Sequence, residues 1–429
     1  MGNLLHPLGK NDFFLPLDNS AVFMAATTGK RTPYMFRISC ELDEPVHLPD
    51  LQAALAETAP RYPAFMTQLC PGLFWYYLDA LKKPLQVQAD TRYPVEYHRL
   101  KKWRRYLFRV RVYGPRIACE FHHILTDGTG AVEFLRSLVA AYLSRRGASC
   151  PDWQDIRRPD QTASPAEYED AYAGLIRKDI PLPDPHPQAW RISGPRYPGP
   201  VYRITTGTVS VAASLKIARE KSVSLTALFA AVHLWTLQAV CEAENPSSFK
   251  AFSLEVPVNM RKIHTSATLR NFFLIIPVLI DRRLGHFSFE EILERVQYSI
   301  KLGLQRKELD RQIKRNVAGE AHPLARAVPL AIKNPVLRLV ARFVAIRYAS
   351  GSLSNLQAVS MPPEFSSRIK RFDFIPPRND SFGSCVGIIT WQDTLSLTIG
   401  SRQVDRSFER FFFTKLVELG IPVMVESNI

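Results

Sequence analysis

The chain has 429 residues, of which 46% are apolar and 22% are charged; this composition excludes a disordered chain and indicates a large folded core. The formal net charge is +15, and the six cysteines are scattered without a Cys-x-x-Cys pair. That pattern argues against a disulfide framework and a structural zinc site, so no metal is expected, and it fits a reducing, cytoplasmic setting.

The first hundred residues predict three elements. Residues 34–42 alternate apolar and polar side chains like a half-buried strand. Residues 48–59 repeat apolar side chains at helical spacing, with Pro49 in the first turn. The apolar run 72–77 predicts a further strand, which either lines a hydrophobic channel or belongs to the core.

A hairpin is predicted next. Residues 107–113 alternate arginine with apolar side chains, and a Gly-Pro turn joins them to a second alternating run that ends near His123. In this run His123 shares the parity of Phe121 and the other apolar residues, whereas His122 shares that of Glu120. Only His123 is therefore expected to reach an interior cavity.

The segment His122-His123-x-x-x-Asp127-Gly128 links this strand to a helix with an apolar stripe over residues 131–142. A neutral imidazole at a strand end is a suitable general base near pH 7. A carboxylate four residues later can fix the base or the turn that carries it. The alternative is that Asp127 only caps the helix and the histidines are ordinary turn residues.

The second half begins after a proline-rich stretch, residues 151–200, which predicts a crossover between two halves. Residues 222–241 contain no charged side chain and are long enough to span a bilayer, but their polar residues favour a buried helix. The further predictions are strands at 252–258 and 273–281, a helix opened by a Ser288–Glu291 capping box, a strand at 351–359, a hairpin over 384–401 and a final helix at 408–419.

Positive charge is concentrated in two stretches. Residues 99–116 contain Lys and Arg without any Asp or Glu, and residues 301–347 are also strongly basic. Such a field attracts anionic partners, for example phosphate-bearing molecules, acidic proteins and anionic membranes. No nucleic-acid-binding pattern is present, so no nucleic-acid partner is expected. Residues 325–348 are apolar with interspersed basic residues and are expected to be broken at Pro329 and Pro335. This pattern indicates either core packing or an amphipathic surface that contacts lipid.

The histidine segment resembles the HHxxxDG signature of the chloramphenicol-acetyltransferase-like superfamily, which includes condensation domains and several groups of acyltransferases. The resemblance covers the whole chain and looks closest to the bacterial alcohol acetyltransferase branch. Gln357 departs from it, because glycine is usual there, and the Asp-Phe-Gly-Trp-Gly motif of the plant enzymes is absent. The other stretches that fit are Leu51 to Pro63, Val256 to Arg261, Asn271-Phe272-Phe273 and Ser352 to Leu356.

The resemblance implies a two-lobed α/β (α+β) fold. Residues 1–180 would form the lobe with the motif and residues 181–429 the second lobe. Each lobe would be a mixed sheet with flanking helices, and an active-site tunnel would run between the two.

The resemblance also implies roles for single residues. His123 would be the general base, reached by an acyl donor and an acceptor from opposite faces, and His122 would support it. Asp127 would pair with an arginine, for which Arg261 is the candidate, unless Arg261 is an exposed loop charge. Three groups are candidates to stabilise the oxyanion, and the sequence does not choose among them: the Gly128 N–H, Ser354 and Asn355.

The leading functional hypothesis is an acyltransferase that moves an acyl group from acyl-CoA to an alcohol, with no permanently bound cofactor. A condensation-type or polyketide-associated transferase that uses a phosphopantetheinyl acyl carrier protein is the second. A catalytically silent scaffold that binds a carrier or lipid is the third, and a peripheral membrane contact is compatible with each of them.

Overall fold

A computed structural model describes residues 13–97, 104–175, 177, 179–184, 186–244, 247, 250–321, 327–343, 348–380 and 382–429. Parts of both basic stretches, residues 99–103 among them, lie outside this range. The helices are α1 (Asn19–Thr27), α2 (Leu48–Thr58), α3 (Gly128–Arg145), α4 (Val211–Glu220), α5 (Leu225–Glu244), α6 (Phe289–Gly303), α7 (Arg306–Ala321), α9 (Leu330–Phe343), α10 (Pro363–Ser366) and α11 (Ser407–Glu418).

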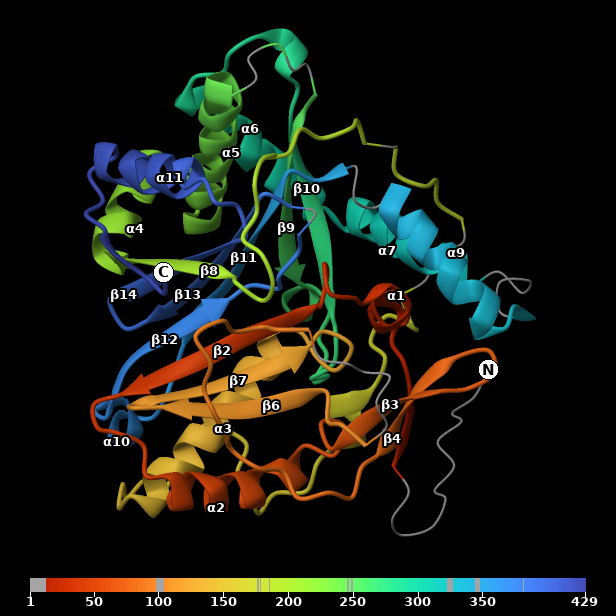
Figure 1. Ribbon diagram of the computed structural model, residues 1–429, viewed down its shortest axis with the longest axis vertical. Helices are drawn as coiled ribbons and strands as arrows, with labels where there is room; N and C mark the ends of the chain where they lie inside the picture. The colour runs from red at the N-terminus through yellow and green to blue at the C-terminus, as the bar shows by residue number, and fades with distance from the viewer. Residues whose placement is uncertain are drawn as a thin grey trace.

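The strands form three sheets, and two of these build the two sheet-rich lobes of a mixed α/β fold (Figure 1). A five-stranded sheet has the order β12 (Ile369–Ile375), β2 (Met35–Leu42), β7 (Arg116–His122), β6 (Phe108–Tyr113) and β5 (Gln88–Ala89). A seven-stranded sheet has the order β10 (Phe273–Ile280), β9 (Phe252–Asn259), β11 (Gly351–Val359), β13 (Ser384–Trp391), β14 (Thr394–Ser401), β8 (Arg203–Ser210) and β15 (Met424–Ser427). A small third sheet contains β1 (Phe14–Pro16), β4 (Tyr76–Ala80) and β3 (Thr67–Pro71).

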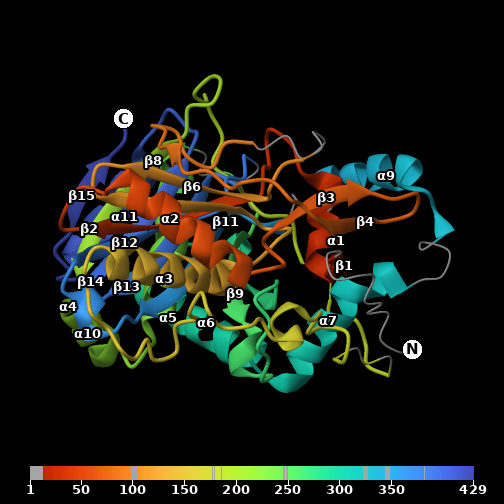
Figure 2. The same ribbon diagram turned by 90° about the horizontal axis from the view of Figure 1, so that it is seen from below.

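The five-stranded sheet carries the histidine motif at the end of β7. The predicted hairpin is present: β6 and β7 pair antiparallel, and Gly114 occupies the turn with φ +52°. Helices α2 and α3 cover one face of this sheet (Figure 2). The core on that face is rich in aromatic rings, such as Phe108 and Phe121, which stack with centroids 5.5 Å apart.

The C-terminal part of the chain contributes to both large sheets. Strand β12 returns to the five-stranded sheet and pairs antiparallel with β2, placing Phe372 opposite Cys40. Strands β11 and β13, which flank it in sequence, belong to the seven-stranded sheet. The division of the lobes at residue 180 stays a prediction.

The seven-stranded sheet packs against α5, which contains most of the long apolar run noticed in the sequence. Within the described residues, α5 is the one helix long and apolar enough to cross a membrane, and its side chains are mostly buried in the core of this lobe. The predicted capping box is present at the start of α6, where Ser288 and Glu291 exchange hydrogen bonds.

Two predictions about secondary structure are wrong. Residues 72–75 are not part of a strand but form the exposed turn between β3 and β4, because the Gly72 N–H donates to the carbonyl of Trp75 and closes a tight turn. Pro335 does not break the helical segment but lies inside α9. It lies in the second turn, where proline removes only one hydrogen bond, to a carbonyl of the exposed first turn.

The other face of the five-stranded sheet buries a cluster of charges. Glu120 is fully buried and forms ion pairs with Arg37, Arg109 and Arg111. Arg37 also donates to Asp90 at 2.6 Å. Burial alone would raise the pKa of the Glu120 carboxyl, but the three guanidinium groups lower it to about 2. The polar side chains of β7 are thus buried as well as the apolar ones, and the alternation in the sequence did not indicate this.

We predict that Glu120→Gln destabilises the protein by about 3 kcal/mol, because it leaves three buried arginines short of negative charge. The matched control is Glu57→Gln, which removes an ion pair to Arg145 from a side chain that is 50% exposed and should cost less than about 1 kcal/mol. Chemical denaturation measures both changes.

The Glu120 pKa is lower in the folded than in the unfolded chain, so its contribution is complete above the unfolded value and is lost as pH falls toward about 2. The difference in stability between wild type and Glu120→Gln should therefore shrink below pH 4.5. A difference that stays constant down to pH 3 would contradict this prediction.

Candidate functional site

The motif forms the junction between β7 and α3. Strand β7 ends at His122, and a tight turn follows in which the Leu125 N–H donates to the His122 carbonyl at 2.8 Å. Asp127 is the N-cap of α3, and its Oδ1 accepts from the N–H groups of Thr129 and Gly130. The junction thus fixes both histidines and the carboxylate relative to one another.

His122 is fully buried and its ring is held by two partners. Its Nδ1 accepts from the Ile124 N–H at 3.1 Å, so the ring proton lies on Nε2, which is 3.2 Å from the Thr28 hydroxyl. Both nitrogens are therefore engaged inside the protein. This geometry suits a residue that holds the turn.

His123 is half-buried and lies where the two lobes meet. Its ring packs 4.7 Å from Phe36 of β2 and 5.7 Å from Phe273 of β10. Burial lowers the pKa of His123, while the hydrogen bond that its Nδ1–H donates to Asn271, the charge of Asp127 and a backbone contact with Thr126 raise it less. The imidazole is therefore neutral at pH 7, and part of it is open to solvent.

Asn271 selects the tautomer of His123. Its Nδ2 donates to the His123 carbonyl at 2.8 Å and to the Asp18 carboxylate at 3.1 Å, so its Oδ1 must face the histidine ring. The Oδ1 lies 3.3 Å from Nδ1 of His123, which places the proton on Nδ1 and the lone pair on Nε2.

The carboxylate of Asp18 holds the Asn271 amide in place. Asp18 is the fully buried N-cap of α1, and burial raises the pKa of its carboxyl to about 6 although Arg270 lowers it. No role was predicted for Asp18 or for Asn271, although Asn271 belongs to one of the stretches that fit the resemblance. Asp18 has the residue type of a helix N-cap, and this could have been predicted from the sequence. Its contact with Asn271 could not, because the two residues are far apart in the chain.

Asp127 uses its second oxygen to bind the other lobe. Its Oδ2 accepts from Arg261 Nη1 at 2.8 Å and from the Phe272 N–H at 2.9 Å. Arg261 is mostly buried and also donates to the carbonyls of Thr268 and Arg270. The structure therefore places Arg261 beside Asp127, not in an exposed loop, and neither Asp127 oxygen faces the open side of His123.

The glycines of the motif permit a close approach of the two lobes. A Cβ on Gly128 would overlap the side chain of Leu356 on β11, and a Cβ on Gly130 would overlap the carbonyl of Leu269. These positions need glycine because of the space available, since neither has a positive φ. The start of α3 thus packs directly on the second lobe.

Ser354 and Asn355 lie on β11, just before Leu356. Asn355 donates to the Thr226 hydroxyl at 3.0 Å and accepts from the Gln357 N–H at 2.8 Å, so its side chain is already engaged. Ser354 is half-buried. Gln357 has φ +66°, a left-handed conformation that explains why glycine is the usual residue at this position.

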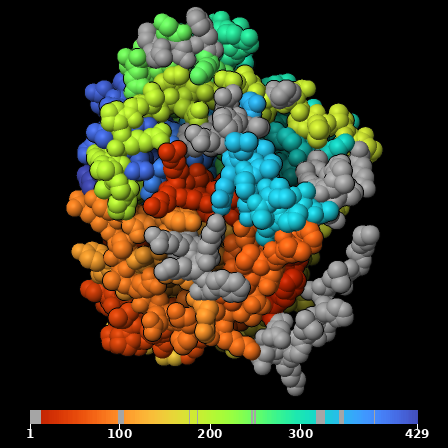
Figure 3. All heavy atoms as spheres, turned by 45° about the vertical axis from the view of Figure 1, so that its right-hand side comes forward, coloured from red at the N-terminus to blue at the C-terminus, as the bar shows by residue number. Residues whose placement is uncertain are grey.

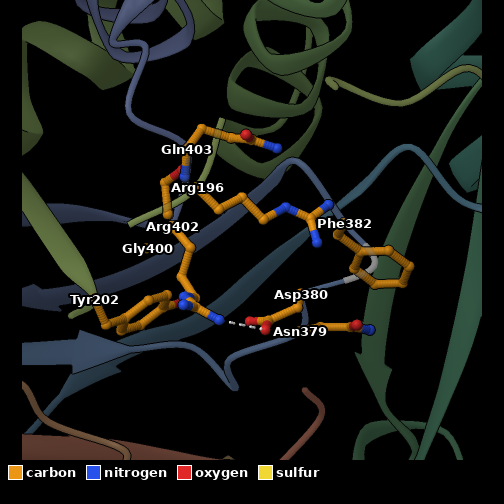
Figure 4. Close-up of a pocket in the computed structure, with 9 residues that line it drawn as sticks. Arg196, Tyr202, Asn379, Asp380, Phe382, Gly400, Arg402 and Gln403 are labelled. Atoms are coloured by element: carbon orange, nitrogen blue, oxygen red, sulfur yellow. Dashed lines mark hydrogen bonds and ion pairs between the residues drawn. The ribbon is translucent and has the colours of Figure 1, made fainter. Parts of the chain in front are cut away.

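The hollow shown in Figure 4 contains none of the predicted site residues. The hollow in Figure 4 is lined by Tyr202, Asp380, Arg402 and their neighbours, and Asp380 neutralises Arg402 there. Within the described parts of the chain, no three His, Cys, Asp or Glu side chains lie close enough together to hold a metal ion.

We predict that Asp127→Asn destabilises the protein by about 3 kcal/mol, because an amide nitrogen would then face the donors of Arg261 and Phe272. The control is Asp393→Asn, an exposed carboxylate that accepts from the Ala212 N–H and the Ser210 hydroxyl, and it should cost less than about 1 kcal/mol. Thermal unfolding measures both, and equal melting temperatures for the two variants would contradict the assigned role.

Solved structures with the same architecture are known, although no protein-family profile and no curated protein matches the sequence. TRI101 of Fusarium sporotrichioides, complexed with coenzyme A and T-2, is 13% identical with a TM-score of 0.64, and the match covers 97% of this chain and 100% of that chain. Polyketide synthase associated protein 5 from Mycobacterium tuberculosis is 14% identical with a TM-score of 0.60, covering 94% and 97%.

The condensation domain of the Monacolin K polyketide synthase MokA is 11% identical with a TM-score of 0.56, covering 95% of this chain and 96% of that chain. Sequence identities this low show that these proteins share a fold with this chain and show nothing more. The chain has the two-lobed fold of the chloramphenicol-acetyltransferase-like and condensation-domain superfamily.

Proposed function

We propose that this protein is an acyltransferase that moves an acyl group from a thioester, acyl-CoA, to the hydroxyl of an alcohol, with His123 as the general base. The observation that carries the proposal is the state of His123. The ring is neutral, half-buried at the meeting of two lobes, and bonded at Nδ1 so that Nε2 carries the lone pair that can accept a proton.

The chemistry follows from that free nitrogen. Nε2 of His123 takes the hydroxyl proton as the oxygen attacks the thioester carbonyl, and a tetrahedral intermediate forms. The imidazolium then returns the proton to the leaving thiolate, which gives an ester and a free thiol. Asn271 accepts from Nδ1 throughout and stabilises the imidazolium between the two steps.

The oxyanion of the intermediate needs a hydrogen-bond donor near Nε2. Of the three candidates, Asn355 is the weakest because its amide already donates to Thr226. The Gly128 N–H is the first amide of α3, and Asp127 caps only the two that follow it. The Gly128 N–H and the Ser354 hydroxyl are therefore the preferred donors.

The passage for the substrates is proposed along the outer face of β10. Alternate residues of this strand, beginning with Phe273 beside His123, are half-buried and apolar, while those between them are buried in the core. An acyl chain would fit such a surface. Glu255 lies on the neighbouring strand opposite Pro277, and burial raises the pKa of its carboxyl to about 7. The acceptor would meet this polar group beyond the apolar residues.

The identity of the donor separates two candidate functions. Coenzyme A is bound in TRI101, a protein of the same fold, and the net charge of +15 would favour its phosphates. The same charge would also favour an acidic carrier protein, and two other solved structures belong to polyketide synthase systems. The second candidate is therefore a condensation-type transferase with a carrier-bound donor. A cytoplasmic location is part of both proposals.

We predict that His123→Ala lowers the rate of thiol release from acyl-CoA, with alcohols supplied as acceptors, by at least about a hundredfold without loss of folding. His122→Ala should cost much less activity but should lower the melting temperature, because its ring bonds Ile124 and Thr28. The control is His286→Ala, an exposed histidine whose side chain is 64% accessible, which should behave like wild type.

Retained turnover in His123→Ala would end the general-base proposal. Transfer from an acyl carrier protein but not from acyl-CoA would select the second candidate function. A chain that binds acyl-CoA but never releases thiol with any acceptor would instead support the silent scaffold.

The pH profile gives an independent prediction. Because the pKa of His123 is lowered, kcat/KM should stay constant through neutral pH and fall only below pH 6.5, where the base becomes protonated. In Asn271→Ala the hydrogen bond that favours the protonated ring is lost, so the acid limb should move to still lower pH while kcat falls about tenfold. An acid limb that is unchanged in Asn271→Ala would contradict the positioning role of Asn271.

A further inference from the structure

Helix α9 exposes its apolar side. Ile332 is 59% exposed, Val336 is 53% and Leu339 is 58%, and their spacing places them on one face of the helix. An amphipathic helix of a globular protein normally turns this stripe toward the core. Here the stripe faces outward.

The inward side of α9 is held by polar contacts. Asn334 donates to the Tyr76 hydroxyl at 2.9 Å, and Arg338 donates to the carbonyl of Ala26 in α1 at 3.0 Å. The Leu330 N–H donates to the carbonyl of Leu73. The helix is thus fixed in an orientation that leaves its apolar stripe uncovered.

The turn between β3 and β4 extends this apolar surface. Leu73 is 69% exposed, and Phe74 and Trp75 are each 37% exposed. Lys333 of α9 lies over the ring of Trp75 at 3.6 Å and donates to the carbonyl of Phe74, so the turn and the helix are directly joined. Figure 3 shows α9 in cyan as a ridge on the surface, next to the orange atoms of the first lobe. We call the exposed residues Leu73, Phe74, Trp75, Ile332, Val336 and Leu339 the apolar ridge.

The charges around the apolar ridge are basic. Residues 327–343 contain no Asp or Glu, and Arg338 is exposed on the side of the helix. Helix α1, which contacts α9, is followed by the exposed residues Lys30 and Arg31 and contains no acidic residue itself. An apolar stripe with flanking cations is complementary to anionic lipid, which offers hydrocarbon below a layer of negative headgroups.

We propose that the apolar ridge docks the protein on the surface of an anionic lipid bilayer, with α9 lying in the plane of the interface. The aromatic ring of Trp75 and the ammonium of Lys333 would lie at headgroup depth, where such groups are favoured. The helix is about 21 Å long, and one face of it with a single turn is small beside the ~800 Å² that each partner of a stable protein dimer buries. A bilayer needs no such area, because each inserted side chain contributes separately.

The docking surface is linked to the candidate site through α1. Helix α9 contacts α1 at Ala26, and the N-cap of α1 is Asp18, which holds Asn271 against His123. This docking proposal does not depend on the acyltransferase proposal, since it rests only on the exposed residues and their charges.

The test is co-sedimentation of the full chain with vesicles of phosphatidylcholine alone and of a roughly 7:3 mixture with phosphatidylglycerol. Wild type should sediment with the mixed vesicles and much less with the neutral ones, and added salt should weaken its binding. Val336→Ser/Leu339→Ser should bind at least about tenfold more weakly. The control Leu284→Ser/Val417→Ser changes one Leu and one Val that are 66% and 58% exposed elsewhere, and it should bind like wild type.

A second variant, Leu73→Ser on the turn, tests the same surface without altering the helix. Equal binding of wild type and the α9 double variant, or no binding of wild type to the mixed vesicles, would overturn the proposal. So would a wild-type dimer in sedimentation velocity that the α9 variant converts to a monomer, because the occupant would then be a second copy of the chain.

Discussion

The carboxylate of Asp127 is the interaction on which the geometry of the candidate site depends. One oxygen ends the turn after β7 and starts α3, and the other holds Arg261 and the amide of Phe272. Because Asn271 directly precedes Phe272, the same carboxylate positions the amide that bonds the ring of His123. A buried group with every lone pair engaged fixes a neighbouring side chain far better than a loop could. The lobes therefore cannot shift against each other here without breaking several hydrogen bonds.

Sequence reasoning was sufficient where the cause of the structure is local. The Gly114 turn and the pairing of β6 with β7 act within a few residues, and both are present as predicted. The cap at Asp127, which is also local, was the alternative considered for that residue, and it is present together with the pairing to Arg261. The parity of the strand also separated the two histidines, since His122 is buried in a polar setting and His123 lies against Phe36.

The sequence was insufficient where distant segments meet. Nothing near Asn271 indicates that its amide faces Asp18, and the pairing of β12 with β2 could not be read from either strand. The prediction of a strand was wrong for residues 72–75, because an apolar run does not reveal whether it is buried. Glu120 is the opposite case. Its place among the polar residues of the alternating strand suggested an exposed side chain, but ion pairs with three arginines allow it to be buried.

The position of β12 has a consequence for biosynthesis. Strand β2 is made early, yet one of its two neighbours in the sheet is made only after most of the second lobe. Until then that edge of β2 offers unpaired backbone groups to any other strand nearby. The nascent chain therefore carries an open sheet edge until β12 has been made.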